Sequence, residues 1–152
     1  MSPKNTKLWI DGDGIPKKIK EILFRAAQKR RVPIIFVSNR WQELPRFPTI
    51  QQVVVSDGLD KADDHIAENC ELGDLIITSD IPLADRCVTK GAKVLTSRGR
   101  ELTVENIKPA LSARNLSEDL RNYGVQTGGP PAISQRDIQN FSNALDRWIQ
   151  KR

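Results

Sequence analysis

Short apolar, β-branched runs alternate along the first two thirds of the chain with segments whose apolar residues recur every three or four positions. The short runs are typical of strands, and the periodic segments are typical of amphipathic helices. We expect strands at residues 7–11, 32–38, 50–56, 74–79 and 92–96. We expect helices between them at residues 15–30, 60–71 and 81–90. This alternation predicts a parallel sheet flanked by helices.

After residue 97 the pattern is helical only. We expect helices at residues 103–115, 117–123 and 135–150, a loop at 124–134, and a structured loop earlier in the chain at 39–49. The predicted architecture is α/β with three layers and a central, mostly parallel sheet. We expect residues 1–152 to form a single domain, in which the C-terminal helical part, about residues 103–152, packs on the sheet.

Charge changes this picture, because the acidic residues are crowded into one stretch. Residues 57–85 hold nine carboxylates and one Lys, which gives −8, whereas residues 1–56 carry +7 and residues 86–152 carry +6, for a total of +5. Crowded carboxylates repel one another, and a hard divalent cation with oxygen ligands is the usual compensation. The basic segments on either side, and the pI of about 9.4, are compatible with binding of a polyanion such as nucleic acid. They are equally compatible with a solvated cationic surface that binds no polyanion.

Composition indicates the cellular compartment and argues against a membrane-spanning protein. Apolar residues make up 38% of the chain, yet no apolar run approaches the ~20 residues of a membrane span. The two cysteines, Cys70 and Cys87, do not form a metal-ligand pattern and are expected to be reduced thiols in the core. We therefore expect a cytoplasmic protein with no membrane partner. The sequence leaves the oligomeric state open.

The acids fall mainly where a parallel sheet places its functional sites, at the carboxyl ends of the strands. The carboxylates expected at this edge are Asp11, Asp13, Asp57, Asp60, Asp63, Asp64, Asp80 and Asp85. Two or three of them are enough to hold one or two Mg²⁺ or Mn²⁺ ions, which would activate a water and stabilise charge on a phosphoryl group. The competing interpretation is structural, because Asp is also favoured in turns and at helix N-caps. Asp80, followed by Pro82 in the first helical turn, fits such a cap.

An aromatic residue lies among cations in the predicted loop at 39–49. Arg40, Trp41 and Arg46 are candidate nucleic-acid-binding residues, since such an arrangement is typical of a stacking platform for single strands. A loop anchored by a buried Trp41 is the alternative.

Three motifs follow one another in order: WIDGDGIP at residues 9–16, GLDKADDHIA at 58–67 and GDLIITSDIPLAD at 73–85. Together with a later run at 127–146, they resemble the YaiI/YqxD family of bacterial proteins over nearly the whole chain. The family is similar to PIN-like domains, which include Mg²⁺- or Mn²⁺-dependent ribonucleases and 5′ nucleases. The resemblance implies a PIN-like fold directly and an activity only by analogy. The family's first motif usually reads Asp-Ala-Asp-Ala-Cys-Pro. In this chain the two alanines are replaced by Gly12 and Gly14 and the cysteine by Ile15, so this protein has no thiol at that position. Both acids of the motif and Pro16 are kept.

Three functions are compatible with these features. The first is a metal-dependent nuclease that acts on single-stranded RNA. Its candidate catalytic residues are Asp11, Asp13, Asp63, Asp64, Asp80 and Asp85, and its candidate metal ligands are Asp11, Asp64, Asp80 and Asp85. The second is a nucleic-acid-binding module without catalysis. The third is a phosphatase in which the first acid of Asp11-x-Asp13 attacks phosphorus, although the order of Asp80 and Lys90 fits that class poorly.

Overall fold

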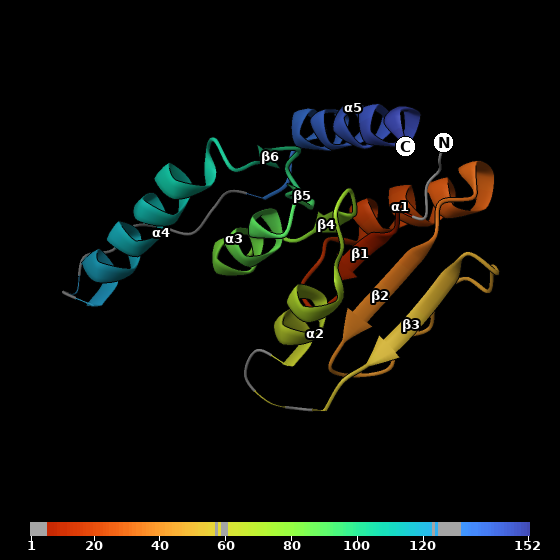
Figure 1. The fold of residues 1–152 in the computed structure, drawn as a ribbon, viewed down its shortest axis with the longest axis horizontal. Helices are drawn as coiled ribbons and strands as arrows, with labels where there is room; N and C mark the ends of the chain where they lie inside the picture. Colours follow the sequence, from red (N-terminus) through yellow and green to blue (C-terminus); the bar gives the residue numbers. More distant parts are fainter. Residues whose placement is uncertain (1–5, 57, 59–60, 123, 125–131) are drawn as a thin grey trace.

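The central sheet has six strands in the order β3-β2-β1-β4-β5-β6 (Figure 1). The computed structural model describes residues 6–56, 58, 61–122, 124 and 132–152. The strands are β1 (Leu8–Asp11), β2 (Ile34–Ser38), β3 (Ile50–Val54), β4 (Leu75–Ile77), β5 (Lys93–Leu95) and β6 (Glu101–Leu102). All neighbouring strands are parallel except β5 and β6, which are antiparallel. The predicted α/β class with a mostly parallel sheet is confirmed.

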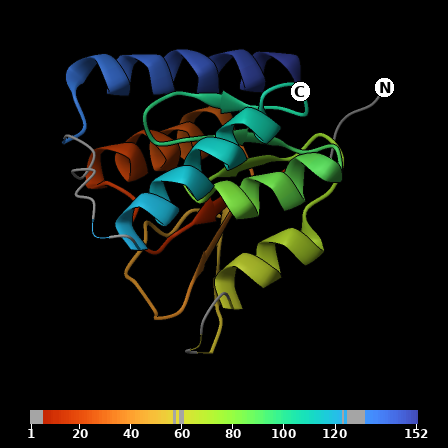
Figure 2. The same ribbon diagram turned by 90° about the vertical axis from the view of Figure 1, so that its left-hand side faces the viewer.

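Five helices connect or follow these strands. They are α1 (Lys17–Arg30), α2 (Lys61–Asn69), α3 (Ile81–Thr89), α4 (Ile107–Asn122) and α5 (Gln135–Lys151). Helices α1 and α5 lie on one side of the sheet, and α2, α3 and α4 lie on the other (Figures 1 and 2). The C-terminal helical part is therefore divided between the two faces. Within the described residues, no helix combines the length and the apolar character needed to cross a membrane.

Each central strand contributes alternate residues to two separate cores. In β1, Leu8 and Ile10 pack with α1 and α5, while Trp9 between them packs with α2 and α3. A strand covered on both faces has no solvent-facing side, which explains its continuous apolar sequence. The two cysteines belong to the second core and are free thiols, as predicted. β3 is the exposed edge and is only half-buried.

Two details of the C-terminal part differ from expectation. The predicted helices at 103–115 and 117–123 are one continuous helix up to Asn122, because the single residue between them, Leu116, is itself a strong helix former. Residue 123 and most of the loop at 124–134 lie outside the described residues. The helix begins later than expected, since the Asn106 side chain accepts from the Thr103 N–H and donates to the Glu101 carbonyl, which fixes a turn. The two-residue strand β6 was missed because it is too short to show a period.

Chain order along the sheet reverses at β1. From β1 the chain continues to β2 and β3 on one side, and then returns to β4, which pairs with the other edge of β1. Ligands of open α/β sheets bind outside the carboxyl ends of the strands at such a switch point. The topology therefore singles out the ends of β1 and β4.

Candidate functional site

A pocket of about 250 Å³ lies at the carboxyl ends of β1 and β4. It is lined by Asp11, Asp13, Gly14, Ile15, Ile77, Thr78, Ser79, Asp80 and Ser97. We call it the carboxylate pocket, because three of the six acids predicted as catalytic residues line it. The expectation that Asp11 and Asp80 meet at one edge of the sheet is confirmed.

The hydroxyl of Thr78 links two of the pocket's acids. Thr78 follows β4, is 4% exposed, and donates to Asp11 Oδ2 at 2.9 Å. The same hydroxyl oxygen accepts from the backbone N–H of Asp80 at 3.1 Å. The end of β4 thereby fixes the Asp11 carboxylate and the start of the next helix relative to each other.

Asp80 is both a helix cap and a pocket residue. Its Oδ1 accepts from the Leu83 N–H at 3.0 Å, so it is the N-cap of α3, and a proline lies in the first turn as the sequence predicted. The structural interpretation of Asp80 is therefore confirmed, yet the same side chain lines the carboxylate pocket. A cap holds a carboxylate in one orientation, which a functional role also requires.

Asp13 connects the pocket to the loop after β2. It is an exposed residue of the β1–α1 connection, and its Oδ2 accepts from the Asn39 N–H at 3.2 Å. Residues 39–49 form a connection without helix or strand between β2 and β3. The loop that carries Arg40 and Trp41 thus begins beside the third acid of the pocket.

The electrostatics of the pocket disfavour charge on Asp11. Burial raises the pKa of the Asp11 carboxyl above its ordinary value, and the negative charges of Asp13 and Asp80 raise it further. Hydrogen bonds from Thr78 and from the Asp13 backbone lower this pKa in part. The three acids therefore repel one another, and a bound cation would reverse the sign of the local field.

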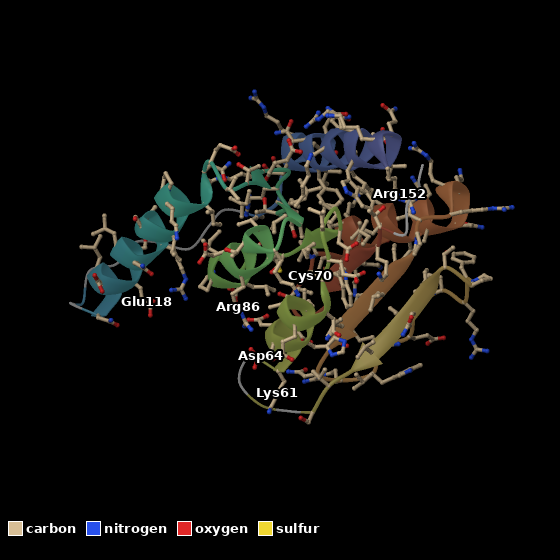
Figure 3. All side chains as sticks on the ribbon, in the orientation of Figure 1. Lys61, Asp64, Cys70, Arg86, Glu118 and Arg152 are labelled. Carbon is tan, nitrogen blue, oxygen red and sulfur yellow. The ribbon has the colours of Figure 1, made fainter. Side chains whose placement is uncertain are left out.

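The other predicted acids do not line this pocket. Asp64 in α2 accepts from Arg86 in α3 at 2.8 Å, and Figure 3 shows these two side chains facing each other between the helices. Asp85 lies 3.9 Å from the Lys108 ammonium. Asp63 is half-buried in the first turn of α2. Asp57 and Asp60, which were also expected at this edge of the sheet, lie outside the described residues.

The carboxylate pocket offers oxygen ligands without forming a closed cage. Among the residues that the structure describes, no three His, Cys, Asp or Glu side chains lie close enough together to hold one ion. The donors of Asp11, Asp13 and Asp80 are nevertheless the hard oxygens that Mg²⁺ and Mn²⁺ take. Mg²⁺ usually keeps several waters and binds through one or two carboxylates, so the donor set fits such an ion.

Two polar residues were missed by the sequence analysis. Thr78 was not singled out, although a hydroxyl residue directly after the apolar strand Leu75–Ile77 is the available signal. Asp74 was counted with the other acids, but it is 1% exposed and accepts from the Lys7 and Glu71 backbones and from the Trp9 indole. Asp74 precedes β4, at the opposite end of this strand from the pocket, and its role is structural.

The loop at 39–49 presents Trp41 to solvent. Trp41 is 68% exposed, and Arg40 and Arg46 are exposed as well. The alternative of a loop anchored by a buried Trp41 is therefore wrong. The Gln52 side chain holds the loop instead, because its Oε1 accepts from the Gln42 N–H and its Nε2 donates to the Gln42 carbonyl, both at 2.8 Å.

Comparison with known proteins gives one consistent result. Residues 9–151 match the family model described as "Uncharacterized BCR, YaiI/YqxD family". A UPF0178 protein of Maridesulfovibrio salexigens is 47% identical over 145 residues, which cover 95% of this chain and 96% of the relative. A UPF0178 protein of Saccharophagus degradans is 48% identical over 145 residues, with 95% and 96% covered, and one of Shewanella baltica strain OS223 is 48% identical over 143 residues, with 94% and 95% covered. No solved structure matches this chain significantly.

Proposed function

We propose that this chain, which belongs to the YaiI/YqxD family, is a nuclease that hydrolyses phosphodiester bonds of single-stranded RNA with Mg²⁺ or Mn²⁺. The observation that carries the proposal is the convergence of Asp11, Asp13 and Asp80 on one pocket at the switch point of the sheet. The proposal also includes a relationship of this family to PIN-like domains, which the resemblance of the sequence motifs implies.

The chain's own residues provide a rigid set of acids. Asp11 is held by Thr78, Asp80 by the first turn of α3, and Asp13 by the Asn39 backbone. Fixed carboxylates position a cation without reorganisation during the reaction. When bound, Mg²⁺ or Mn²⁺ would activate a water and stabilise charge on the phosphoryl group. Asp64 and Asp85, which pair with cations, are assigned no ligand role in this proposal.

The exposed loop supports a single-stranded substrate. A duplex hides its base faces in the stack, whereas an unpaired base can stack on an exposed Trp41. Arg40 and Arg46 flank this ring in sequence and would contact the neighbouring phosphates. Since the Asn39 backbone bonds to Asp13, a base on this platform places its phosphate near the carboxylate pocket.

A binding module without catalysis is the second candidate, because Asp80 has a complete structural role as a cap. A phosphatase is less well supported. No Lys is present among the described residues that line the carboxylate pocket, whereas that chemistry requires one.

Metal binding is tested first by thermal unfolding with EDTA and with Mn²⁺. At a Mn²⁺ concentration 100 times its Kd, binding to the native state alone adds about 2.7 kcal/mol. For a chain of this size, this corresponds to a rise in Tm of about 5–10 °C. The double variant Asp11→Asn with Asp80→Asn should lose the shift. Identical melting curves of the native protein with and without Mn²⁺ would contradict the metal site.

Catalysis is tested with purified protein, Mn²⁺ and a labelled single-stranded RNA. Asp80→Asn should abolish cleavage while it preserves the cap, because Asn is as good an N-cap as Asp. Glu118→Gln is a matched control, since Glu118 pairs with Arg114 on α4, away from the pocket. Asp64→Asn and Asp85→Asn should retain cleavage. RNA binding without cleavage under any metal supports the binding module, and turnover of a phosphomonoester that needs Asp11 supports the phosphatase.

A further inference from the structure

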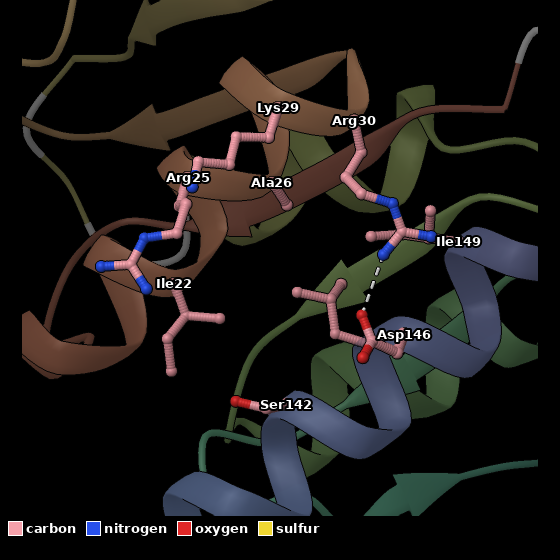
Figure 4. Close-up of a pocket in the computed structure, with 9 residues that line it drawn as sticks. Ile22, Arg25, Ala26, Lys29, Arg30, Ser142, Asp146 and Ile149 are labelled. Carbon is pink, nitrogen blue, oxygen red and sulfur yellow. Dashed lines mark hydrogen bonds and ion pairs between the residues drawn. The ribbon is translucent and has the colours of Figure 1, made fainter.

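A second pocket of about 250 Å³ lies between α1 and α5, on the face of the sheet that these two helices cover (Figure 4). Its lining is apolar where the helices meet, with Ile22 and Ala26 from α1 and Leu145 and Ile149 from α5. We call it the α1/α5 pocket. It shares no lining residue with the carboxylate pocket.

The rim of the α1/α5 pocket is cationic. Arg30 donates to Asp146 at 3.0 Å and spans the gap between the helices. Arg25 and Lys29 extend along the same side of α1 in Figure 4, and neither has an ion-pair partner among the described residues. With the Arg30–Asp146 pair neutral, the rim carries a net charge of +2. Arg25 and Lys29 are thus two neighbouring cations whose charge is not neutralised by an ion pair, and such a pair of cations favours an anionic ligand.

The rim continues along α1 as a stripe. Lys18, Ile22, Arg25 and Lys29 are spaced by four, three and four residues, which places them on one face of the helix. At 1.5 Å per residue, the stripe is about 16 Å long. It starts three residues after Ile15, which lines the carboxylate pocket, and it ends at the α1/α5 pocket.

We infer that this α1 stripe (Lys18, Arg25 and Lys29) binds the phosphates of a single RNA strand beyond the carboxylate pocket, and that the α1/α5 pocket receives one of its bases. The inference rests on the proposed function for the identity of the strand. Spaced cations match spaced phosphates, and the apolar floor matches the face of a base. An anionic membrane fits less well, because the apolar residues lie in a recess, whereas membrane-binding helices present them outward.

The phosphate contacts are tested by the double variant Arg25→Gln with Lys29→Gln. Gln has a helix propensity close to that of Arg and Lys, so α1 should remain intact, and thermal melts verify this. The control is Lys93→Gln with Lys151→Gln, which removes two exposed cations outside the stripe. Binding is measured by fluorescence anisotropy with a labelled single-stranded 16-nucleotide RNA in EDTA, where a metal-dependent cleavage does not interfere.

Each lost phosphate contact on a single strand lowers the slope of log K against log salt by about 0.7, which is about fivefold in affinity at 0.1 M salt. The stripe variant should therefore weaken binding about 25-fold and reduce the slope by about 1.4. The control should change both quantities far less. Ser142→Leu, which fills the α1/α5 pocket without removing charge, should weaken binding and leave the slope unchanged.

The results separate this inference from the proposed function. Loss of binding in the stripe variant but not in the control supports the stripe, even if the native protein cleaves no RNA. Cleavage that depends on Asp80, combined with equal binding by the stripe variant and the control, overturns the stripe and leaves the nuclease standing. Full affinity in Ser142→Leu overturns the base pocket. A stripe variant that loses binding to vesicles with 20% anionic lipid, but keeps RNA binding, overturns the inference in favour of a membrane surface.

Discussion

Replacing Asp74 by Ala should destabilise the fold more than any change in the carboxylate pocket. The Asp74 side chain is 1% exposed and accepts three hydrogen bonds. Its Oδ1 accepts from the Lys7 N–H at 2.9 Å, and its Oδ2 accepts from the Trp9 indole at 2.9 Å and the Glu71 N–H at 3.0 Å. One carboxylate therefore joins the start of β1 to the turn before β4.

The magnitude follows from the donors that Ala would leave without an acceptor. Leaving the buried indole N–H of Trp9 without an acceptor would lower the free energy of unfolding by about 1–3 kcal/mol. The two backbone N–H groups are only partly buried and water can reach them in part, so each would cost about 1 kcal/mol. The total is about 3–5 kcal/mol, against a stability of about 5–15 kcal/mol for a typical domain. Asp74→Asn can keep its carbonyl oxygen on Trp9 and Glu71 but turns an NH₂ group toward Lys7, so about 1–3 kcal/mol is expected.

The free energies of unfolding of the native protein, Asp74→Asn and Asp74→Ala are measured by urea titration at 25 °C, with tryptophan fluorescence as the signal. Glu71→Gln is the control, since the Glu71 side chain is 69% exposed in its ion pair and its backbone N–H is unchanged, so little effect is expected. A cost below about 1 kcal/mol for Asp74→Ala would refute the assigned hydrogen-bonding role. A loss of the Mn²⁺ response in folded Asp74→Asn would show that the structural and metal-binding acids are assigned wrongly.

Three further substitutions test the carboxylate pocket and the backbone beside it. Asp11→Asn should raise the free energy of unfolding at neutral pH, because the folded protein holds the pKa of this carboxyl above its unfolded value; the gain should disappear as the pH falls below the ordinary value of 3.8, where both states are protonated. Gly12→Ala should cost about 1–3 kcal/mol, because the added Cβ would overlap the ring of Phe36, even though the family usually has Ala there. Asp80→Ala should cost about 1 kcal/mol through the lost bond to the Leu83 N–H, and Asp80→Asn should cost less. Denaturant titrations at pH 3.5 and pH 7 measure the first, and thermal melts the other two.

Opposite outcomes would be equally informative. A gain in Asp11→Asn that is the same at both pH values would mean that charge on Asp11 is not its cause. A neutral Gly12→Ala would show that the Phe36 ring moves aside and that the core around this ring is adaptable. Equal losses in Asp80→Ala and Asp80→Asn would mean that the cap contributes little to α3.

The strands and most helices were predictable because their signals are local. The continuous apolar segments that form β2 and β4 fit strands buried on both faces, and the period of apolar residues in α5 fits a helix packed on one side. Where the local signal was weak, the prediction was incomplete. Strand β6 has two residues, and its pairing with β5 is decided by the long-range fold.

The general position of the candidate site was also predictable. Parallel strands bring their carboxyl ends to one edge, so Asp11 and Asp80 were expected to meet although they are 69 positions apart in the sequence. The dense run of acids in residues 57–85 was a poorer guide. It suggested a single cluster, whereas the structure places Asp64 and Asp85 beside cations of neighbouring helices.

The sequence by itself determined which elements form and at which edge of the sheet the acids gather, because periodicity, propensity and strand direction are properties of local segments. Only the tertiary structure decided which acids share a pocket and which one is buried as a structural acceptor. Asp74 and Asp80 are both acids that flank β4, yet one bonds to the base of β1 and the other lines the pocket. That difference depends on how the helices and strands pack against one another, since packing sets the direction of each side chain and its exposure to water.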